Sequence, residues 1–358
     1  ASSSTMCRLA IPLYQRRELI YNMAYTTITK STSTQFTKLY TGAGSNITVS
    51  DIPFNPDFVW FKKRDGASAS ELYDQIRGAT KYLISNSNDA EDTNVNGLTA
   101  FGTGGWTIGG GGLAGSGSYV SWNWKANGAG SANADGSITT TSTSVDTTAK
   151  FSISKWTGDG TGGSSIGHGL GVKPEFVIIK RLEGAQSWYV WNQYLGDNYL
   201  ELDTTTTSAS GGLTVSASTI TFPNSWSIYN ASGESMICYA FAPVLGYSKF
   251  GGYTGNSETN GVFVYTGFKP TWVMLKRTDS ADWWGMYDGV RNTSNVVGDR
   301  LYAQANDAEA TVTNLDFLSN GFKLRSTDGA INSSGGTYIY AAFGQTVVGT
   351  NNVPATAR

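Results

Sequence analysis

One pattern of residues occurs three times along this 358-residue chain, and the repetition limits the folds that are open to it. Each occurrence starts at a proline, continues as a run of four apolar residues and stops at adjacent basic residues. The apolar runs are Phe58–Phe61, Phe176–Ile179 and Trp272–Leu275. Their prolines, Pro56, Pro174 and Pro270, are about 100 positions apart, whereas solenoid repeats are far shorter. The spacing therefore predicts tandem units rather than a solenoid.

The similarity continues after each run and is weakest in the middle of the chain. The first and third occurrences both lead to Tyr-Asp-x-x-Arg, at residues 73–77 and 287–291. Both then reach Asn-Asp-Ala-Glu, at residues 88–91 and 306–309. The second occurrence replaces Tyr-Asp-x-x-Arg with Trp191-Asn192-Gln193-Tyr194. We therefore expect one unit used three times, with the middle unit the most diverged.

Composition favours an all-β fold. Alternating and β-branched residues dominate, glycine is abundant (44 residues), and few stretches show a helical period. We predict three tandem antiparallel β-sandwich units of jelly-roll or lectin-like type, with less than a tenth of the chain in helices. The predicted boundaries are an N-terminal extension at 1–34, unit 1 at 35–126, a Gly/Ser/Thr-rich linker at 127–147, unit 2 at 148–245, unit 3 at 246–346 and a tail at 347–358.

The apolar runs have no polar face. A strand that is apolar on both sides is typically central and covered on both faces. We expect one face of each run to meet the second sheet of its own unit, and the other to meet a loop or a neighbouring unit.

The first 22 residues do not resemble the rest of the chain. They lack the apolar core and cleavage site of a secretory signal, and Met23 begins a stretch that looks like a natural start. We hypothesise that residues 1–22 are upstream sequence read in frame. The intact mass of the protein from its native source tests this, and a mature chain that starts at Ala1 would contradict it.

Charge and cysteine content disfavour several function classes. The net charge of −2 comes without a basic block, so we expect no nucleic-acid partner. No apolar run approaches the roughly 20 residues of a membrane span. Cys7 and Cys238 are too few for a disulfide framework, and Cys238 is expected to be a buried thiol. His168 is expected to be a turn residue, and no cofactor is expected.

The repeated Tyr-Asp-x-x-Arg motif has a catalytic and a structural interpretation. A single active site has no need of two copies, so we favour structural ion pairs. The pairs are Asp74 with Arg77, and Asp288 with Arg291.

The Asn-Asp-Ala-Glu motif supplies clustered oxygens that could hold Ca²⁺. It lacks the ligand spacing of an EF-hand loop, so a solvated turn is favoured over a metal site. The weak calcium candidates are Asp89, Glu91, Asp307 and Glu309.

Tryptophans that follow turns are the candidates for ligand contact. An exposed indole can stack on a sugar face, whereas a buried one packs between units, and we favour packing for most of them. The candidates are Trp188, Trp191, Trp283 and Trp284. Recognition is expected in loops, of which Gly102–Gly117 and Asp203–Thr221 differ most between units.

The chain resembles a family of marine bacteriophage proteins described as tail-fibre-like or virion structural proteins. The resemblance extends from Met23 to Arg358 and includes no catalytic motif. It rests on Met23–Ile28, Pro56–Trp60, Asp74–Gly78, Trp122–Gly128, Gly167–Pro174, Gly246–Gly251, Tyr265–Pro270 and Gly335–Tyr340. It implies repeated concanavalin-like β-sandwiches on a virion surface.

Three functions are compatible with these observations. The first is a non-enzymatic virion appendage or fibre-like module that contacts host-surface glycans, together with other virion proteins and as a homo-oligomer or in many copies. The second is a capsid decoration or cement protein. The third is a glycan depolymerase, which is disfavoured because the sequence has no compact acidic pair.

Overall fold

The structure is a computed structural model that describes residues 26–28 and 30–346. The predicted N-terminal extension up to residue 25, with the proposed start at Met23 and with Cys7, lies outside these residues, as does the predicted tail. The fold is all-β, as predicted, with several antiparallel sheets arranged as sandwiches and only 5% of residues in helices.

Unit 1 forms two sheets. Its elements are η1 (Ser31–Ser33), β1 (Gln35–Gly42), β2 (Ile47–Val49), β3 (Phe58–Lys63), β4 (Glu71–Asp74), β5 (Lys81–Ile84), β6 (Asp92–Thr93), β7 (Leu98–Gly102), β8 (Gly105–Ile108), η2 (Gly112–Ala114) and β9 (Gly117–Trp124). The larger sheet has the order β1-β9-β3-β4-β5-β6, and the smaller has the order β2-β8-β7.

Unit 2 is built in the same way with a longer main sheet. Its elements are β10 (Ser131–Asn133), β11 (Thr140–Asp146), β12 (Phe151–Thr157), β13 (Ser165–Gly167), β14 (Phe176–Arg181), β15 (Tyr189–Asn192), η3 (Gln193–Leu195), β16 (Asn198–Glu201), β17 (Ala209–Ser210), β18 (Thr214–Val215), β19 (Thr219–Thr221), α2 (Ser227–Asn230) and β20 (Ser235–Phe241). The sheets have the orders β10-β11-β12-β20-β14-β15-β16-β17 and β13-β19-β18.

Unit 3 folds one continuous sheet back on itself. Its elements are β21 (Ser248–Thr254), β22 (Phe263–Tyr265), β23 (Phe268–Arg277), β24 (Trp284–Asp288), β25 (Val297–Tyr302), β26 (Ala310–Leu318), β27 (Gly321–Leu324), α3 (Gly329–Asn332) and β28 (Thr337–Thr346). The order is β21-β28-β23-β24-β25-β26-β27-β22. Buried residues of β22, β26 and β27 share one core with β23, so the sheet supplies both layers of a sandwich.

The same four-strand arrangement occurs in all three units. One strand near the start of each unit (β1, β12 or β21) pairs with the last strand, the last pairs with the strand that carries the apolar run, and that strand pairs with the next one along the chain. The register is also shared, because the first residue of each run lies opposite an aromatic residue at or near the end of the last strand. These pairs are Phe58 with Trp124, Phe176 with Phe241, and Trp272 with Phe343.

The prediction that residues 127–147 form a linker is wrong. Residues 127–147 contain β10 and β11, which extend the main sheet of unit 2, and β11 pairs with β12 from Ser142 to Asp146. Threonine is a good strand former, and the hydroxyls of Thr140 and Thr143 satisfy each other at 2.8 Å. A polar segment can therefore form strands at a sheet edge.

The glycine-rich segment Gly102–Gly117 is likewise more ordered than a flexible loop. It contains β8 and η2, and Leu113 and Ala114 are buried in the core of unit 1. In unit 3 the strand also starts earlier than expected, because β23 passes through Pro270 with a bulge before Trp272. Proline is tolerated where the ladder is irregular.

The two apolar faces of each run pack into two different cores. In unit 1, Val59 and Phe61 lie in the unit's own core, whereas Phe58 and Trp60 lie in a core common to all units. Units 2 and 3 divide their runs in the same alternating way. Because strand side chains alternate between faces, one strand joins each sandwich to the centre of the molecule.

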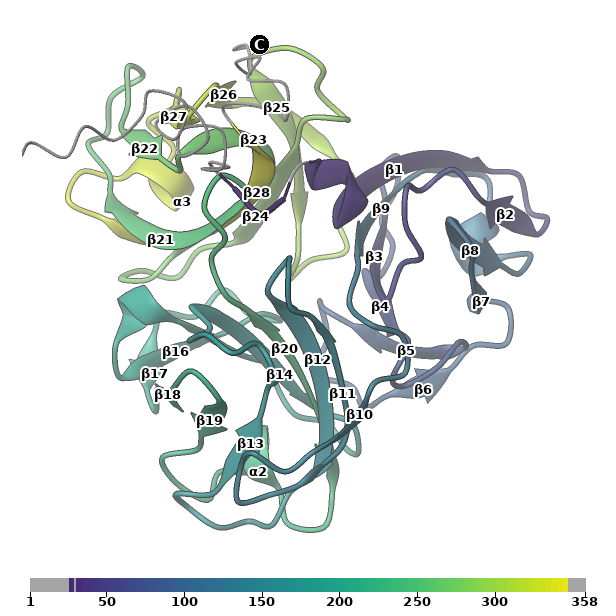
Figure 1. Cartoon of the computed structure of the whole chain (residues 1–358). Coiled ribbons are helices and arrows are strands. Elements are labelled where there is room, and N and C mark those ends of the chain that lie inside the picture. The colour runs from purple at the N-terminus through teal and green to yellow at the C-terminus, as the bar shows by residue number, and fades with distance from the viewer. Residues whose placement is uncertain (1–25, 29, 347–358) are drawn as a thin grey trace, which may run out of the picture.

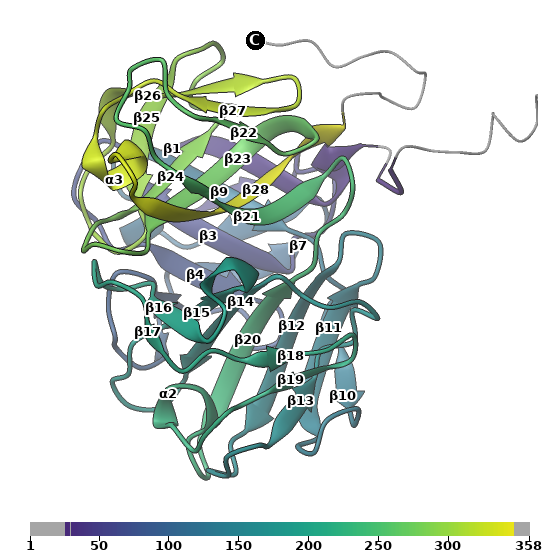
Figure 2. The ribbon, with the colours of Figure 1, turned by 90° about the vertical axis from the view of Figure 1, so that its left-hand side faces the viewer.

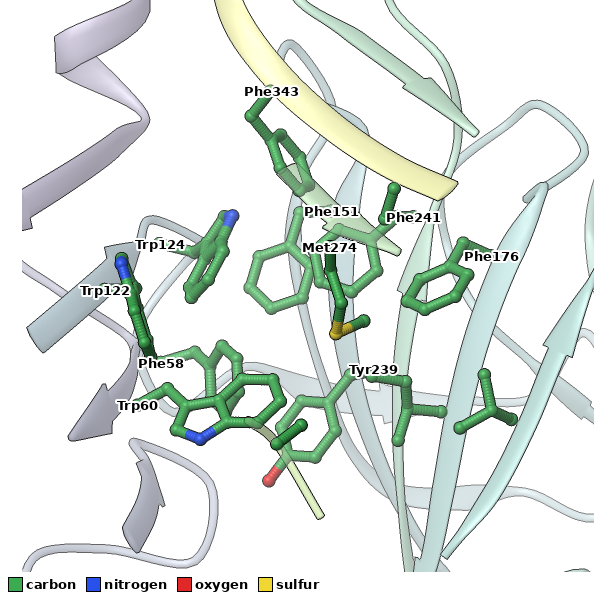
Figure 3. Packing of buried hydrophobic residues seen from close by; sticks show 14 of the residues in the cluster. Phe58, Trp60, Trp122, Trp124, Phe151, Phe176, Tyr239, Phe241, Met274 and Phe343 are labelled. Carbon is green, nitrogen blue, oxygen red and sulfur yellow. The ribbon is translucent and has the colours of Figure 1, made fainter. Parts of the chain in front are cut away.

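The common core, called the central core here, gathers aromatic side chains from all three units (Figure 3). The Trp124 ring centroid lies 5.4 Å from that of Phe58 in unit 1, 6.5 Å from Phe241 in unit 2 and 5.5 Å from Trp272 in unit 3. Phe151 and Phe241 stack at 4.5 Å. The units form three lobes around this core (Figure 1). In the view of Figure 2, the main sheet of unit 1 lies behind unit 3.

Trp124→Ala should lower the free energy of unfolding by about 3–5 kcal/mol, because it opens a cavity where three units meet. We expect native-state hydrogen exchange to become faster in β3, β14 and β23 together. Trp106→Ala is the matched control, since Trp106 is equally buried but lies in the core of unit 1 alone. Faster exchange confined to unit 1 in Trp124→Ala would contradict a shared core.

Candidate functional site

The repeated Tyr-Asp-x-x-Arg motifs form buried ion pairs. Arg77 Nε lies 2.5 Å from Asp74 Oδ2, and Arg291 Nε lies 2.6 Å from Asp288 Oδ2, with all four side chains buried. Each carboxylate also accepts the backbone N–H of its arginine at 2.9 Å, which closes the turn after β4 or β24. Burial alone would raise the pKa of Asp288, but Arg291 and the hydrogen bonds hold that pKa below its ordinary value.

Each of these carboxylates also accepts a hydrogen bond from the neighbouring unit. Tyr239 Oη of unit 2 donates to Asp74 Oδ2 at 2.7 Å, and Trp122 Nε1 of unit 1 donates to Asp288 Oδ2 at 3.0 Å. The two donors hold equivalent places, because each lies opposite the third residue of its unit's apolar run. The ion pairs therefore serve the contacts between units, which we call seams.

The seam between units 2 and 3 lacks this arrangement on both sides. Asn192 takes the place of the aspartate and Leu195 that of the arginine. Ala341 of unit 3 occupies the donor position. Asn192 Oδ1 accepts the backbone N–H of Tyr194 at 2.9 Å, while its Nδ2 has no hydrogen-bond partner. This seam therefore lacks both the aspartate that accepts the hydrogen bond and the aromatic residue that donates it in the other two seams.

A pair of backbone hydrogen bonds closes every seam. In each, the turn after an apolar run exchanges two bonds with a segment of the next unit. The bonds are Ser68 N to Asn306 O and Glu309 N to Arg64 O between units 1 and 3, Gln186 N to Asn88 O and Glu91 N to Leu182 O between units 1 and 2, and Asp282 N to Thr205 O and Ser208 N to Thr278 O between units 2 and 3, all at 2.7–3.0 Å. The three units thus form a closed ring.

The Asn-Asp-Ala-Glu turns belong to these seams, which corrects the expectation of a purely solvated turn. Glu309 accepts two hydrogen bonds from Arg64 of unit 1, at 2.7 and 2.9 Å, and one from Arg291 at 2.8 Å. Burial opposes ionisation, but both arginines hold the pKa of Glu309 below its ordinary value. Among the described residues, no group of three or more histidines, cysteines and carboxylates is placed to hold a metal ion.

Three buried lysines are seam residues that the sequence analysis missed. Lys62, Lys180 and Lys276 follow the apolar runs and are fully buried. Each Nζ donates to a carbonyl of its own unit and to one of the neighbour. The neighbour's carbonyls are Ala305 O at 2.6 Å, Asn88 O at 3.1 Å and Thr205 O at 3.3 Å, respectively. Burial lowers the pKa of each lysine to about 8.

Three of the four candidate tryptophans are buried, which is the packing that the sequence analysis favoured for most of them. Trp188 and Trp284 are 0% and 1% exposed, and their Nε1 atoms donate across seams to Ile84 O at 2.9 Å and Glu201 O at 2.8 Å. Trp191 is 4% exposed and bonds within unit 2. Trp283 is half-buried beneath the guanidinium of Arg300, 4.3 Å from the ring centroid. Trp188 and Trp284 therefore link neighbouring units.

His168 and Cys238 are both buried. His168 Nδ1 accepts the backbone N–H of Leu170 at 3.1 Å, which fixes its turn, and burial lowers its pKa. Cys238 lies in the core of unit 2 as a free thiol whose pKa is raised by burial.

Among the residues that the structure describes, the exposed aromatic side chains are those of Tyr194, Trp226, Phe263 and Tyr265. Trp226 is 41% exposed and is the sole exposed tryptophan among the 11, all of which are described. It lies against the predicted recognition loop, because a Cβ atom on Gly211 would fall 2.2 Å from its ring. Sequence analysis did not identify Trp226, because its exposure depends on how the loop folds.

The chain belongs to the family described as Domain of unknown function (DUF7483), which it matches over residues 30–346. The matched region covers all three units. A search of curated proteins found no match. Within the described residues, no helix has the length and apolar character required to span a membrane.

Asp288→Ala should destabilise the protein by about 3–5 kcal/mol, because it leaves Arg291 and the Trp122 N–H buried with a lost partner. The matched control is Asn192→Ala at the equivalent position of the third seam, for which we expect about 1 kcal/mol. Urea denaturation measures both. Equal effects of the two substitutions would show that the ion pair adds nothing to the seam.

Stability should rise with pH between about 8 and 10. Each seam lysine has a folded-state pKa of about 8, below the ordinary value of about 10.4. In this window the unfolded chain binds more protons than the folded one, so raising the pH favours folding. Above about pH 10 the buried tyrosines reverse the trend, because burial raises the pKa of Tyr239 and Tyr287.

Lys62→Met tests the origin of this rise in urea titrations at several pH values. The variant should show a shallower increase than the wild type over the same window. An identical slope would mean that Lys62 does not contribute.

Proposed function

We propose that this protein is a non-enzymatic structural component of a bacteriophage particle. It acts as a surface appendage or fibre-like module that contacts host-surface glycans, and its partners include other virion proteins. Its place is the surface of the particle, where many copies act together.

The proposal rests on one observation: the charged motifs are used up in contacts between units, whereas aromatic side chains are left on the surface. The motifs that suggested chemistry hold the seams, and their carboxylates Asp74, Asp288 and Glu309 are already paired with arginines. These ion pairs favour a structural protein over a glycan depolymerase, because such an enzyme needs free acidic groups. The aromatic side chains left outside are of the kind that stack on sugar rings, and Trp226 adjoins a loop rich in small polar residues.

Capsid decoration is the second candidate, and the closed ring of units favours it. A body whose three lobes share one core is stiff enough to bridge neighbouring shell proteins. This candidate requires no host molecule, so glycan binding separates the two.

Individual contacts of this kind are weak. We expect a dissociation constant of roughly 1 mM for a single site, or about −4 kcal/mol. Adhesion of whole particles would then depend on the presence of many copies.

Two measurements test the proposal. Labelled antibody against the protein should bind intact phage particles, and the purified protein should bind some members of a glycan array when it is displayed at high density. Absence of label on particles would overturn the virion assignment. Label without glycan binding at any concentration would replace the appendage with capsid decoration.

A further inference from the structure

The seam between units 2 and 3 differs from the others in what it leaves exposed. The residue before the arginine position is Ile76 in unit 1, Tyr194 in unit 2 and Val290 in unit 3. Ile76 packs on the central core, whereas Val290 is 42% exposed and Tyr194 is 61% exposed. Loss of the ion pair here thus coincides with an aromatic side chain that stands at the edge of the seam.

Tyr194 lies against a glycine of the next unit. A Cβ atom on Gly252 of β21 would fall 3.0 Å from Cδ1 of the tyrosine ring, so a side chain there would push against the ring. The register places Lys155 and Leu39 at the equivalent positions of the other units. The seam between units 2 and 3 is therefore the one that combines a tyrosine with a glycine, and the tyrosine keeps an open surface.

A groove of about 340 Å³ runs beside this pair, at the lower end of the roughly 300–1,000 Å³ of ligand pockets. Tyr194 forms a wall of it and supplies its apolar surface, because the lining residue Ile339 is buried in the central core. Thr254 and Thr337 line it and are exposed. None of the lining residues is charged.

The strand edge adds hydrogen-bonding groups. The carbonyl of Phe250 accepts Gln193 Nε2 from unit 2 at 3.4 Å, so Phe250 directs its backbone groups away from β28. Alternate residues of an antiparallel strand point their backbone groups the same way. Gly252 and Thr254 therefore direct N–H and C=O groups toward the side on which Tyr194 lies.

We propose that this groove binds one neutral pyranose ring of a glycan. The apolar face of the sugar would lie on Tyr194, and its hydroxyls would meet Thr254, Thr337 and the backbone of Gly252. The lack of charged lining residues selects a neutral hexose over a sialic or uronic acid. The inference rests on the proposed glycan contact and names its site and sugar class.

The test measures binding of methyl hexopyranosides and of methyl glucuronide to the full chain by saturation-transfer NMR and titration. Tyr194→Ala should weaken hexoside binding roughly tenfold, whereas Tyr194→Phe, which keeps the ring, should stay within about threefold. Gly252→Ala, which displaces the ring, should weaken it as well. Tyr265→Ala is the control that removes an exposed aromatic residue outside the groove and should leave binding unchanged. Trp226→Ala tests the alternative contact beside the loop Asp203–Thr221.

The outcomes separate the site from the function. Hexoside binding that survives Tyr194→Ala but is lost in Trp226→Ala would overturn the groove and leave the glycan contact standing elsewhere. Preference for the glucuronide would overturn the neutral-sugar assignment. If the wild-type protein binds no sugar at all, the groove and the proposed glycan contact fail together. Melting temperatures of the variants close to that of the wild type exclude misfolding as the cause.

Discussion

The structure depends on the burial of strands that carry apolar side chains on both faces. Phe58 and Trp60 cannot be covered by the second sheet of unit 1, because Val59 and Phe61 already occupy that face. Exposing such a surface would cost about 25 cal/mol per Å² of apolar area. The neighbouring units remove it from water, and the same requirement in units 2 and 3 closes the ring.

Polar groups in the seams fix how the units meet. Apolar packing alone tolerates sliding, whereas a buried lysine or carboxylate is costly unless its partners are in place. Lys62 and Asp288 each have a partner in another unit, so one relative placement satisfies them. The seam between units 2 and 3 has exchanged part of this network for apolar residues and an exposed tyrosine. Its groove can therefore vary without loss of the ring.

The sequence predicted what is local and missed what joins distant segments. The apolar runs identified the central strands, and the spacing of Asp74 and Arg77 placed both in one turn. The partner of Asp288 could not be anticipated, because Trp122 is 166 residues away and carries no local signal. For the same reason the sequence left Trp188, which follows a turn, open between sugar contact and packing, and the structure shows that unit 1 covers it. The strands within residues 127–147 were missed because a polar threonine run looks like a linker.

The cooperativity of thermal unfolding tests the shared core most directly. Differential scanning calorimetry gives the calorimetric enthalpy, and the shape of the transition gives the van't Hoff enthalpy. If the three units unfold as one body, a single transition should appear with a ratio of the two enthalpies near 1. Separate transitions, or a van't Hoff enthalpy near one third of the calorimetric value, would mean that each sandwich is stable alone and that the central core does not unite them.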